Sequence, residues 1–347
     1  MFARGLFRLF LSLITAVVSA TAVFASDHEP FKLAVVAPTE QDHLAWAGAL
    51  QLKRTAANHG IEIISEQASL TGSTDSPPLL FIMPVRSLAT QVPALQVLEL
   101  PFFYPSLLAV HQRLDGALGR QLSEEARKRG WEILAYWDEG MHIFSGLKRY
   151  DRVRNFKARE FLVTRPDPVA EQQFRYWKAD ARRIDPEDRQ TVLRECLIAS
   201  RAATLQEILR EQLYRVHLSM SLSNHRYEGW VVVAPATRWT QLDNAIRTRF
   251  NQALSETTTW QRNDTRLRES VALARLKKAG MTIHEVDEAE HLAFRKALPD
   301  WTELLPNDMP LQQKLKLIGL AGTTTVVGPV SGSTKARRNP APGTYAR

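Results

Sequence analysis

The apolar patterns at the start of the chain limit its fold most strongly. Residues 31–38 (FKLAVVAP) form a short apolar run that ends in proline, which predicts a buried strand. Residues 41–60 carry apolar side chains at helical spacing and stop at a glycine. Residues 61–68 alternate like a strand, and residues 77–85 (PPLLFIMPV) form another apolar run. Strand, helix and strand in this order predict an α/β lobe with a largely parallel sheet.

The rest of the chain continues this alternation of strand and helix patterns. Strands are predicted at residues 131–140, 159–166, 229–235 and 281–287. Helices are predicted at residues 106–130 with a break near Asp115 and Gly116, and at residues 168–179, 188–216, 240–280 and 288–305. A chain of 347 residues, 44% of them hydrophobic, is long enough for two such domains, each with its own core.

The first 25 residues have the pattern of an export signal. Arg4 and Arg8 precede an uncharged apolar run that ends in small residues before Ser26. This order predicts a signal peptide at residues 1–25, cleaved after Ala25. A retained membrane anchor is the alternative interpretation, although no polar or basic stop-transfer pattern closes the run. No later segment approaches 18 uninterrupted apolar residues, so the mature chain is not predicted to span a membrane.

The net charge of +8 does not indicate nucleic-acid binding. Most of it lies in the leader and in residues 323–347, and residues 26–324 carry only +2. A surface that binds phosphates needs basic residues clustered in the folded part of the chain. Residues 323–347 are rich in Gly, Pro, Ser and Arg without periodicity and predict a disordered basic tail. Cys196 is the only cysteine, so an internal disulfide is excluded and a buried, inert thiol is expected.

Five segments, in this order along the chain, resemble one protein family. They are VLELPFFYPSLLAVHQRLDGALGRQL (97–122), GWEILAYWDEG (130–140), FKAREFLV (156–163), SNHRYEGWVVV (223–233) and LARLKKAGMTIHEVDEAEHLAFRKAL (273–298). The family is that of the DctP-type solute-binding proteins of tripartite ATP-independent periplasmic (TRAP) transporters. The resemblance covers roughly residues 97–298 and rests on the order and spacing of the segments.

The resemblance implies a periplasmic receptor with a two-lobed α/β fold, hinge-crossing strands and long C-terminal helices. Lobe I would comprise residues 26–140 and about 229–265, and lobe II residues 141–228 and about 266–322. The two lobes would close on a small ligand, usually an organic acid, and the receptor would then dock on a membrane permease. The stretch 133–150 would be one crossing between the lobes and 223–233 the return crossing.

The resemblance also implies a binding site whose polar groups are replaced in this chain. In the family, an arginine on the first strand of lobe II binds the ligand carboxylate through a two-donor fork. A gapless comparison places that arginine at Leu162 and a second family arginine at His142. The family asparagine falls on Ala202 or Ala203 in the SRAAT segment. The usual organic acid therefore lacks its expected anchors.

Four residues are the candidates for lining the ligand cleft. Arg165 faces the cleft if its strand is shifted by two residues, and otherwise it is an exposed residue at a strand end. His142 falls on a cleft position, where it could donate to an anionic ligand, more strongly when protonated below about pH 6.5. Trp137 and Tyr227 lie on or beside the two crossings and either present a ring to the ligand or pack in the core.

Other chemistry finds little support in the sequence. The nine histidines show no close metal-binding spacing, and no nucleophile elbow, phosphate-binding loop or dinucleotide fingerprint occurs. No metal, cofactor or catalytic activity is predicted. Three interpretations stay open: a TRAP-type solute receptor, a periplasmic accessory or interaction protein that has lost solute capture, and a receptor for an apolar ligand.

Overall fold

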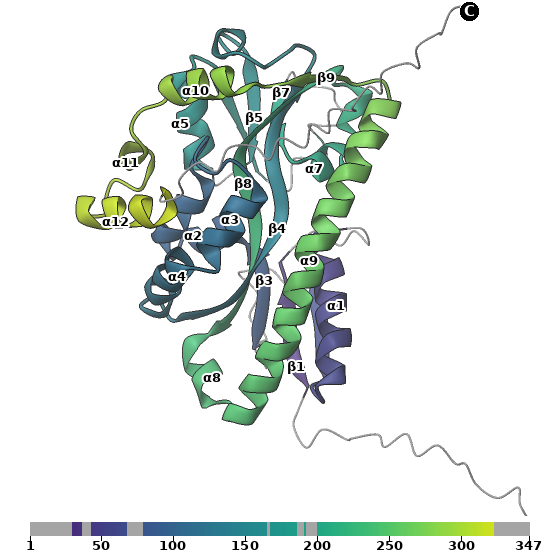
Figure 1. Cartoon of the computed structure of the whole chain (residues 1–347), viewed down its shortest axis with the longest axis vertical. Coiled ribbons are helices and arrows are strands. Elements are labelled where there is room, and N and C mark those ends of the chain that lie inside the picture. The colour runs from purple at the N-terminus through teal and green to yellow at the C-terminus, as the bar shows by residue number, and fades with distance from the viewer. Residues whose placement is uncertain are drawn as a thin grey trace, which may run out of the picture.

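The computed structural model describes residues 30–36, 43–67, 79–164, 167–185, 191 and 200–322 (Figure 1). The predicted leader and basic tail, together with Arg165 and Cys196, lie outside the described residues.

The strands are β1 (Phe31–Val35), β2 (Ile63–Gln67), β3 (Leu80–Pro84), β4 (Trp131–Gly146), β5 (Glu160–Thr164), β6 (Asp180–Ile184), β7 (Ser200–Ala203), β8 (Ser219–Pro235) and β9 (Thr282–Glu285). The longer helices are α1 (Leu44–Asn58), α3 (Leu107–Leu114), α4 (Ala117–Arg127), α5 (Pro168–Tyr176), α9 (Asn244–Lys278), α10 (Glu288–Lys296) and α12 (Leu311–Gly322). Short helices are α2 (Val85–Ala89), η1 (Pro93–Glu99), η2 (Val153–Asn155), α7 (Leu205–Arg210), η3 (Leu213–Arg215), α8 (Ala236–Gln241) and α11 (Trp301–Leu304).

One mixed sheet runs through the molecule in the order β2-β1-β3-β8-β4-β7-β5-β6, with β9 also paired to β8. β1 is parallel to β2 and β3, as the sequence predicts, whereas β8 is antiparallel to both β3 and β4. β4 and β8 have 16 and 17 residues, longer than ordinary strands, because each passes from one lobe into the other. These two strands are the predicted crossings.

Each lobe has hydrophobic cores on both faces of the sheet. In lobe I, one core lies under η1, α3, α4 and α12, and the other under α1 and the first part of α9. In lobe II, an aromatic core lies under α5 and α10, and a smaller aliphatic core lies under α7 and the last part of α9. α9 is one helix of 35 residues, and it runs along both lobes (Figure 1).

Local sequence signals account for where the main helices begin and end. The Asp243 carboxylate accepts from the backbone N–H of Ala245 at 2.7 Å and starts α9, which ends before Gly280 at φ +94°. α5 begins with Pro168 at its first turn, and the carboxylate of Asp167 caps it. Asp167 therefore occupies a fixed position at the edge of lobe II.

Two sequence predictions are wrong in this structure. Residues 200–203 form strand β7, whereas the sequence pattern predicts helix through this segment. α11 and α12 pack on lobe I, because Leu305, Met309 and Leu317 belong to the core beneath η1 and α4, whereas the sequence assigns residues 266–322 to lobe II. The chain therefore returns to lobe I after α10, which makes a fourth crossing between the lobes after β4, β8 and α9.

Gly48 on α1 provides a test of how tightly lobe I packs. A Cβ at this position would lie 2.5 Å from the Trp137 ring. We expect Gly48→Ala to lower the free energy of unfolding by about 1–3 kcal/mol, because the well-packed ring cannot yield without a shift of β4. Thermal unfolding measures the loss. Gly319→Ala on α12 is the control, since a Cβ there meets nothing within 4 Å and should be neutral or slightly stabilising. Equal effects of both substitutions would contradict the packing argument.

Candidate functional site

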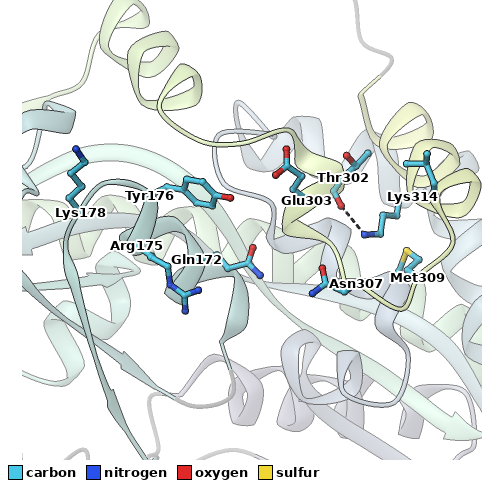
Figure 2. Close-up of a pocket in the computed structure, with 10 residues that line it drawn as sticks. Gln172, Arg175, Tyr176, Lys178, Thr302, Glu303, Asn307, Met309 and Lys314 are labelled. Atoms are coloured by element: carbon cyan, nitrogen blue, oxygen red, sulfur yellow. Dashed lines mark hydrogen bonds between the residues drawn. The ribbon is translucent and has the colours of Figure 1, made fainter.

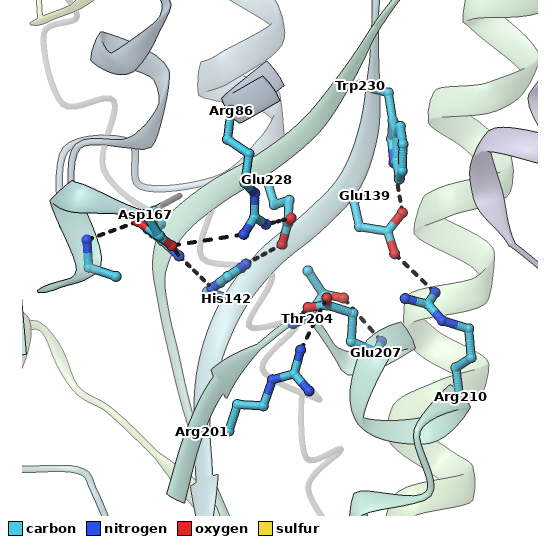
Figure 3. A network of polar contacts seen from close by, with 12 residues as sticks. Arg86, Glu139, His142, Asp167, Arg201, Thr204, Glu207, Arg210, Glu228 and Trp230 are labelled. Atoms are coloured by element: carbon cyan, nitrogen blue, oxygen red, sulfur yellow. Dashed lines mark hydrogen bonds and ion pairs between the residues drawn. The ribbon is translucent and has the colours of Figure 1, made fainter. Parts of the chain in front are cut away.

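A small, partly enclosed space lies where the crossing strands meet lobe II. This space, called here the cleft cavity, has a volume of about 30 Å³, enough for one or two water molecules. Its walls are formed by Arg86, His142, Leu162, Val163, Asp167, Ala170, Phe174, Arg201, Ala202, Glu207 and Arg226. Figure 3 shows the polar residues of this region, which come from α2 in lobe I, from both crossing strands and from lobe II.

The register of the crossing strands brings three of these groups together. His142 on β4 is paired with Arg226 on β8, and Gly140 is paired with Glu228. Paired residues share a face of the sheet and successive residues alternate. His142, Arg226 and Glu228 therefore project to the same side, with Tyr227 on the other.

Arg226 is the centre of a buried network. Its two Nη atoms donate to the two carboxylate oxygens of Asp167, each at 2.7 Å, and both side chains are about 95% buried. The Nη2 atom also lies 3.3 Å from Nδ1 of His142, and since a guanidinium only donates, Nδ1 accepts. The Nε2–H of His142 is then the donor to Glu228.

Burial and the charge of Arg226 hold the pKa of His142 well below its usual value. His142 is therefore a neutral imidazole near pH 7. The sequence-based expectation of stronger donation just below pH 6.5 is wrong for this reason. The same burial raises the pKa of Glu139, which accepts from the indole N–H of Trp230 at 2.8 Å and pairs with Arg210 at 3.3 Å.

Arg86 connects lobe I to this network. It lies in the short helix α2, directly after β3, and its side chain is 18% exposed. Its guanidinium pairs with Glu228 and lies 3.9 Å from Asp167. An ion pair from α2 to the N-cap of α5 spans the two lobes and closes the cavity on that side.

Arg201 supplies a buried guanidinium from the neighbouring strand. In the sheet, Arg201 on β7 is paired with Leu162 on β5, and both line the cleft cavity. Its guanidinium pairs with Glu211 and lies 3.6 Å from the carboxylate of Glu207. Glu207 is fixed by a capping box, in which it accepts from the N–H of Thr204 at 3.0 Å and Thr204 accepts from its N–H at 3.2 Å.

Glu99 lies at the end of η1 beside the network and is buried. Burial, and secondarily the charge of Asp167, raise the pKa of Glu99 to about 7. Between pH 4.5 and about 7, the carboxyl group of Glu99 is therefore protonated in the folded protein but ionised in the unfolded chain. The free energy of unfolding therefore falls by about 3 kcal/mol as pH rises from about 4.5 to 7, and Glu99 contributes no further change above that range.

We expect Glu99→Gln to remove this dependence. The variant should match the wild type near pH 4.5 and be more stable by about 2–3 kcal/mol at pH 8, because no charge is buried at residue 99. Denaturant unfolding at several pH values measures the difference. Glu269, whose pKa burial also raises to about 7, is present in both proteins and cancels in the comparison. Parallel stability curves for the two proteins would show that Glu99 is not the titrating group.

The four candidate residues from the sequence have different positions in the structure. His142 lines the cleft cavity, whereas Arg165 lies outside the described residues. Trp137 is fully buried in the lobe I core, and its indole N–H donates to Thr258 at 3.0 Å. Tyr227 is also buried, and its hydroxyl donates to the carbonyl of Trp137 at 3.1 Å. Neither ring lines the cleft cavity in this structure: Tyr227 projects to the face opposite Arg226 and packs in the core under η1 and α4, and Trp137 packs in the other lobe I core, under α1 and α9.

The residues aligned with the family's polar positions lie at or next to the cleft cavity. Leu162 and Ala202, which the comparison aligns with the family's arginine and asparagine, line the cavity, while Ala203 packs in the aliphatic core of lobe II.

The three arginines of the cavity, Arg86, Arg201 and Arg226, are not among the residues predicted from the sequence. The sequence pattern could have indicated Arg226, because Arg226 and Glu228 alternate with Tyr227 on a predicted crossing and so share one face of the strand. No sequence pattern indicated Arg201, because the segment that contains it is predicted to be a helix.

The side chains of His142, Glu207 and Glu228 could in principle hold a metal ion. One ligand atom from each lies within 4.8 Å of the others. Arg86 and Arg226 contact two of the three groups, however, so a divalent cation would face positive charge at close range. The donor set fits a cation poorly in this surrounding, and no other group of this kind occurs among the described residues.

A larger groove lies on the outside of the molecule. It has a volume of about 920 Å³ and lies between α5 of lobe II and the α11–α12 region (Figure 2). Gln172, Arg175 and Tyr176 line one side, and Thr302 and Lys314 line the other, where Lys314 donates to the carbonyl of Thr302 at 2.9 Å. The groove is open and lacks the convergent, buried polar groups of the cleft cavity.

Most of the described chain matches the model of one known protein family. The profile of the bacterial extracellular solute-binding proteins, family 7 (DctP), matches residues 79–305. The chain belongs to this family. The matched range contains both crossing strands and every residue that lines the cleft cavity. Family 7 consists of solute-binding proteins, and in the described part of the chain no helix combines the length and apolar character needed to cross a membrane.

Relatives and solved structures support the same assignment. The chain is 25% identical over 221 residues to the C4-dicarboxylate-binding protein DctB of Bacillus subtilis, covering 63% of each protein. It is 23% identical over 204 residues to the C4-dicarboxylate-binding periplasmic protein DctP of Rhodobacter capsulatus, covering 58% of this chain and 61% of that one. The aligned part thus spans less than two thirds of either relative.

Solved structures of TRAP periplasmic solute-binding proteins share the fold. The Ochrobactrum anthropi protein, with its C-terminus bound in the ligand-binding pocket, has a TM-score of 0.76 at 19% identity, covering 84% of this chain and 94% of that one. The Pseudomonas aeruginosa protein with bound L-malate has a TM-score of 0.69 at 20% identity, covering 78% and 98%. The predicted two-lobed α/β fold with crossing strands is confirmed.

Proposed function

We propose that this protein is the periplasmic receptor of a TRAP-type transporter and that it captures a small carboxylate-bearing solute in the cleft cavity. The observation that carries the proposal is the position of Arg201. The family arginine is replaced by Leu162, yet Arg201 projects from the paired position on the next strand into the same cavity. A ligand carboxylate that takes the two parallel donors of this planar guanidinium replaces its present contacts with Glu211 and Glu207.

The family relatives support solute capture over the role of an interaction protein. Two of them are named for binding C4-dicarboxylates, and one solved structure holds L-malate. The cleft cavity itself is polar and contains three guanidinium groups, which favours an ionised ligand over an apolar one. Binding followed by docking on a membrane permease, without catalysis, is the function we propose.

Ligand capture requires the lobes to separate. A space of about 30 Å³ cannot admit an organic acid, so the structure corresponds to a closed state. Contacts between the lobes hold this state. Phe102 of lobe I, whose φ is +55°, makes two contacts with lobe II. Its backbone N–H donates to the carbonyl of His225 at 2.5 Å, and its ring stacks on that of Phe294 with 5.1 Å between the centroids. A ligand that bridges the lobes would stabilise the closed state.

Thermal unfolding of the exported protein against a panel of carboxylates tests this function. A ligand at 100 times its dissociation constant adds about 2.7 kcal/mol to the free energy of unfolding, which raises Tm by roughly 4 °C or more. Neutral sugars and neutral lipids, which have no carboxylate, serve as negative controls. Stabilisation by members of the carboxylate panel supports the proposal. A panel of carboxylates that leaves Tm unchanged while a lipid raises it would overturn the proposal.

A further inference from the structure

The segment that carries Phe102 is fixed to lobe I on both sides of that residue. Leu100 and Phe103 pack on the core beneath η1 and α4. The carbonyl of Pro101 accepts from the indole N–H of Trp301 at 3.3 Å, and the ring of Phe103 meets the same indole edge-on with 4.5 Å between the centroids. Trp301 lies on α11 and packs against the lobe I core. The backbone at residue 102 is therefore part of lobe I.

The ring of Phe102, in contrast, packs against the aromatic core of lobe II. It contacts four side chains of that lobe, called here the aromatic socket: Trp177, His225, His291 and Phe294. The distances between the centroid of Phe102 and theirs are 5.9, 5.6, 5.5 and 5.1 Å, in the same order. A phenylalanine at φ +55° is uncommon, and such a conformation persists only where the surrounding contacts over-determine it.

The aromatic socket belongs to the folded interior of lobe II. His291 and Phe294 lie one turn apart on α10, Trp177 ends α5, and His225 is on β8. Trp177, His225 and Phe294 are each no more than 3% exposed. Other rings of lobe II hold them in place, as where His225 stacks on Phe144 with 4.0 Å between the centroids. A single side chain of lobe I thus contacts a surface that lobe II builds from its own core.

Neither Phe102 nor the aromatic socket lines the cleft cavity. We propose, on the basis of the receptor function above, that Phe102 is a positioning residue, an interlobe latch that sets the ratio of closed to open protein and thereby the affinity for every ligand of the cleft. Opening the lobes withdraws the ring from the socket and exposes apolar surface to water, so the latch favours the closed state. A ligand that binds only the closed state has an apparent affinity proportional to the closed fraction.

The separation of the lobes in the ligand-free protein tests the latch directly. Spin labels are attached at Lys53→Cys in α1 of lobe I and at Lys157→Cys in lobe II, two exposed positions, in a Cys196→Ser background. Double electron–electron resonance then gives the distribution of distances between them. We expect Phe102→Ala to lower the closed-to-open ratio by about tenfold or more, because it removes one buried ring, and Phe102→Leu to give an intermediate ratio. Identical distributions for the wild type and Phe102→Ala would overturn the proposal.

The neighbouring residue supplies the matched control. Phe103→Ala removes a ring of the same size, but the aromatic contacts of Phe103 are with Tyr104 and Trp301 of lobe I. The lobe distance should therefore stay as in the wild type. An equal shift in Phe103→Ala and Phe102→Ala would mean that damage to the lobe I segment opens the protein, which would contradict the latch.

A double-mutant cycle with His291→Ala tests the socket from the lobe II side. Each single substitution should lower the closed-to-open ratio. Because the two rings touch only in the closed state, we expect the combined substitution to lower the ratio by less than the product of the two single effects. Effects that simply multiply would show that Phe102 and His291 are not coupled and would overturn the assignment of the socket.

Ligand affinity connects the latch to solute capture. Isothermal titration calorimetry with L-malate and succinate should show that Phe102→Ala raises Kd by the same factor as it lowers the closed fraction, with most of the change in the dissociation rate. A higher Kd without a change in lobe distance would overturn the latch and assign Phe102 another role in binding. If no carboxylate of the panel binds the wild type, the proposed function fails, whereas the lobe distances still decide the latch.

Discussion

Arg226→Met is expected to lower the free energy of unfolding by about 3–5 kcal/mol at pH 7. The carboxylate of Asp167 is 5% exposed and receives both hydrogen bonds of the Arg226 fork. Without the guanidinium it remains a buried charge, with only the cap to Ala170 and the more distant Arg86 to compensate it. Thermal unfolding should show a Tm lower by roughly 5–8 °C.

A second substitution isolates the cause of that loss. In Arg226→Met/Asp167→Asn the buried charge is absent, and asparagine still caps α5, since Asn is as good an N-cap as Asp. We expect the double variant to recover more than half of the lost stability. The account is contradicted if the double variant is no more stable than Arg226→Met, because the loss would then come from packing and not from the unpaired carboxylate.

Arg201→Met is expected to weaken carboxylate binding by about 10²-fold or more. A hydrogen bond to a charged group contributes roughly 1.5–3 kcal/mol, and the planar fork of Arg201 offers two of them. Arg201→Lys keeps the charge without the fork and should fall between the wild type and the methionine variant. Titration calorimetry measures the three affinities.

The control for this series is Arg127→Met. Arg127 makes a two-donor pair with Glu132 at 2.7 and 2.8 Å but is 53% exposed and does not line the cleft cavity. Its removal should leave affinity unchanged. Because Arg201 also pairs with Glu211, the unfolding temperature of each variant must be recorded beside its affinity. Folded Arg201→Met protein with wild-type affinity would show that another group anchors the ligand.

Much of the fold follows from local sequence patterns. The strand and helix patterns between residues 31 and 140, and the long helix after residue 240, correspond to elements of the structure. β7 was missed because the apolar residues around Ala202 and Ala203 also suit a helix, and only pairing with β4 and β5 selects the strand. The docking of α12 on lobe I could not be predicted, because periodicity identifies an apolar face without showing which surface covers it.

The candidate site was only partly predictable. His142, Leu162 and Ala202, the positions that the comparison assigns to family polar groups, all line the cleft cavity. The comparison could not reveal that Arg201 projects from the position paired with Leu162, because that pairing depends on the register of two strands far apart in sequence. The sequence places Trp137 and Tyr227 on or beside the crossings but does not show which face each ring takes, and in the structure both pack in the lobe I cores.

A crystal structure of the protein grown with the tightest-binding carboxylate of the panel tests the central claim most directly. The account predicts the ligand in the cleft cavity, with both oxygens of one carboxylate about 2.7–2.9 Å from the guanidinium of Arg201. A ligand bound instead in the groove between α5 and α12, or in the cleft without contact to Arg201, would contradict it.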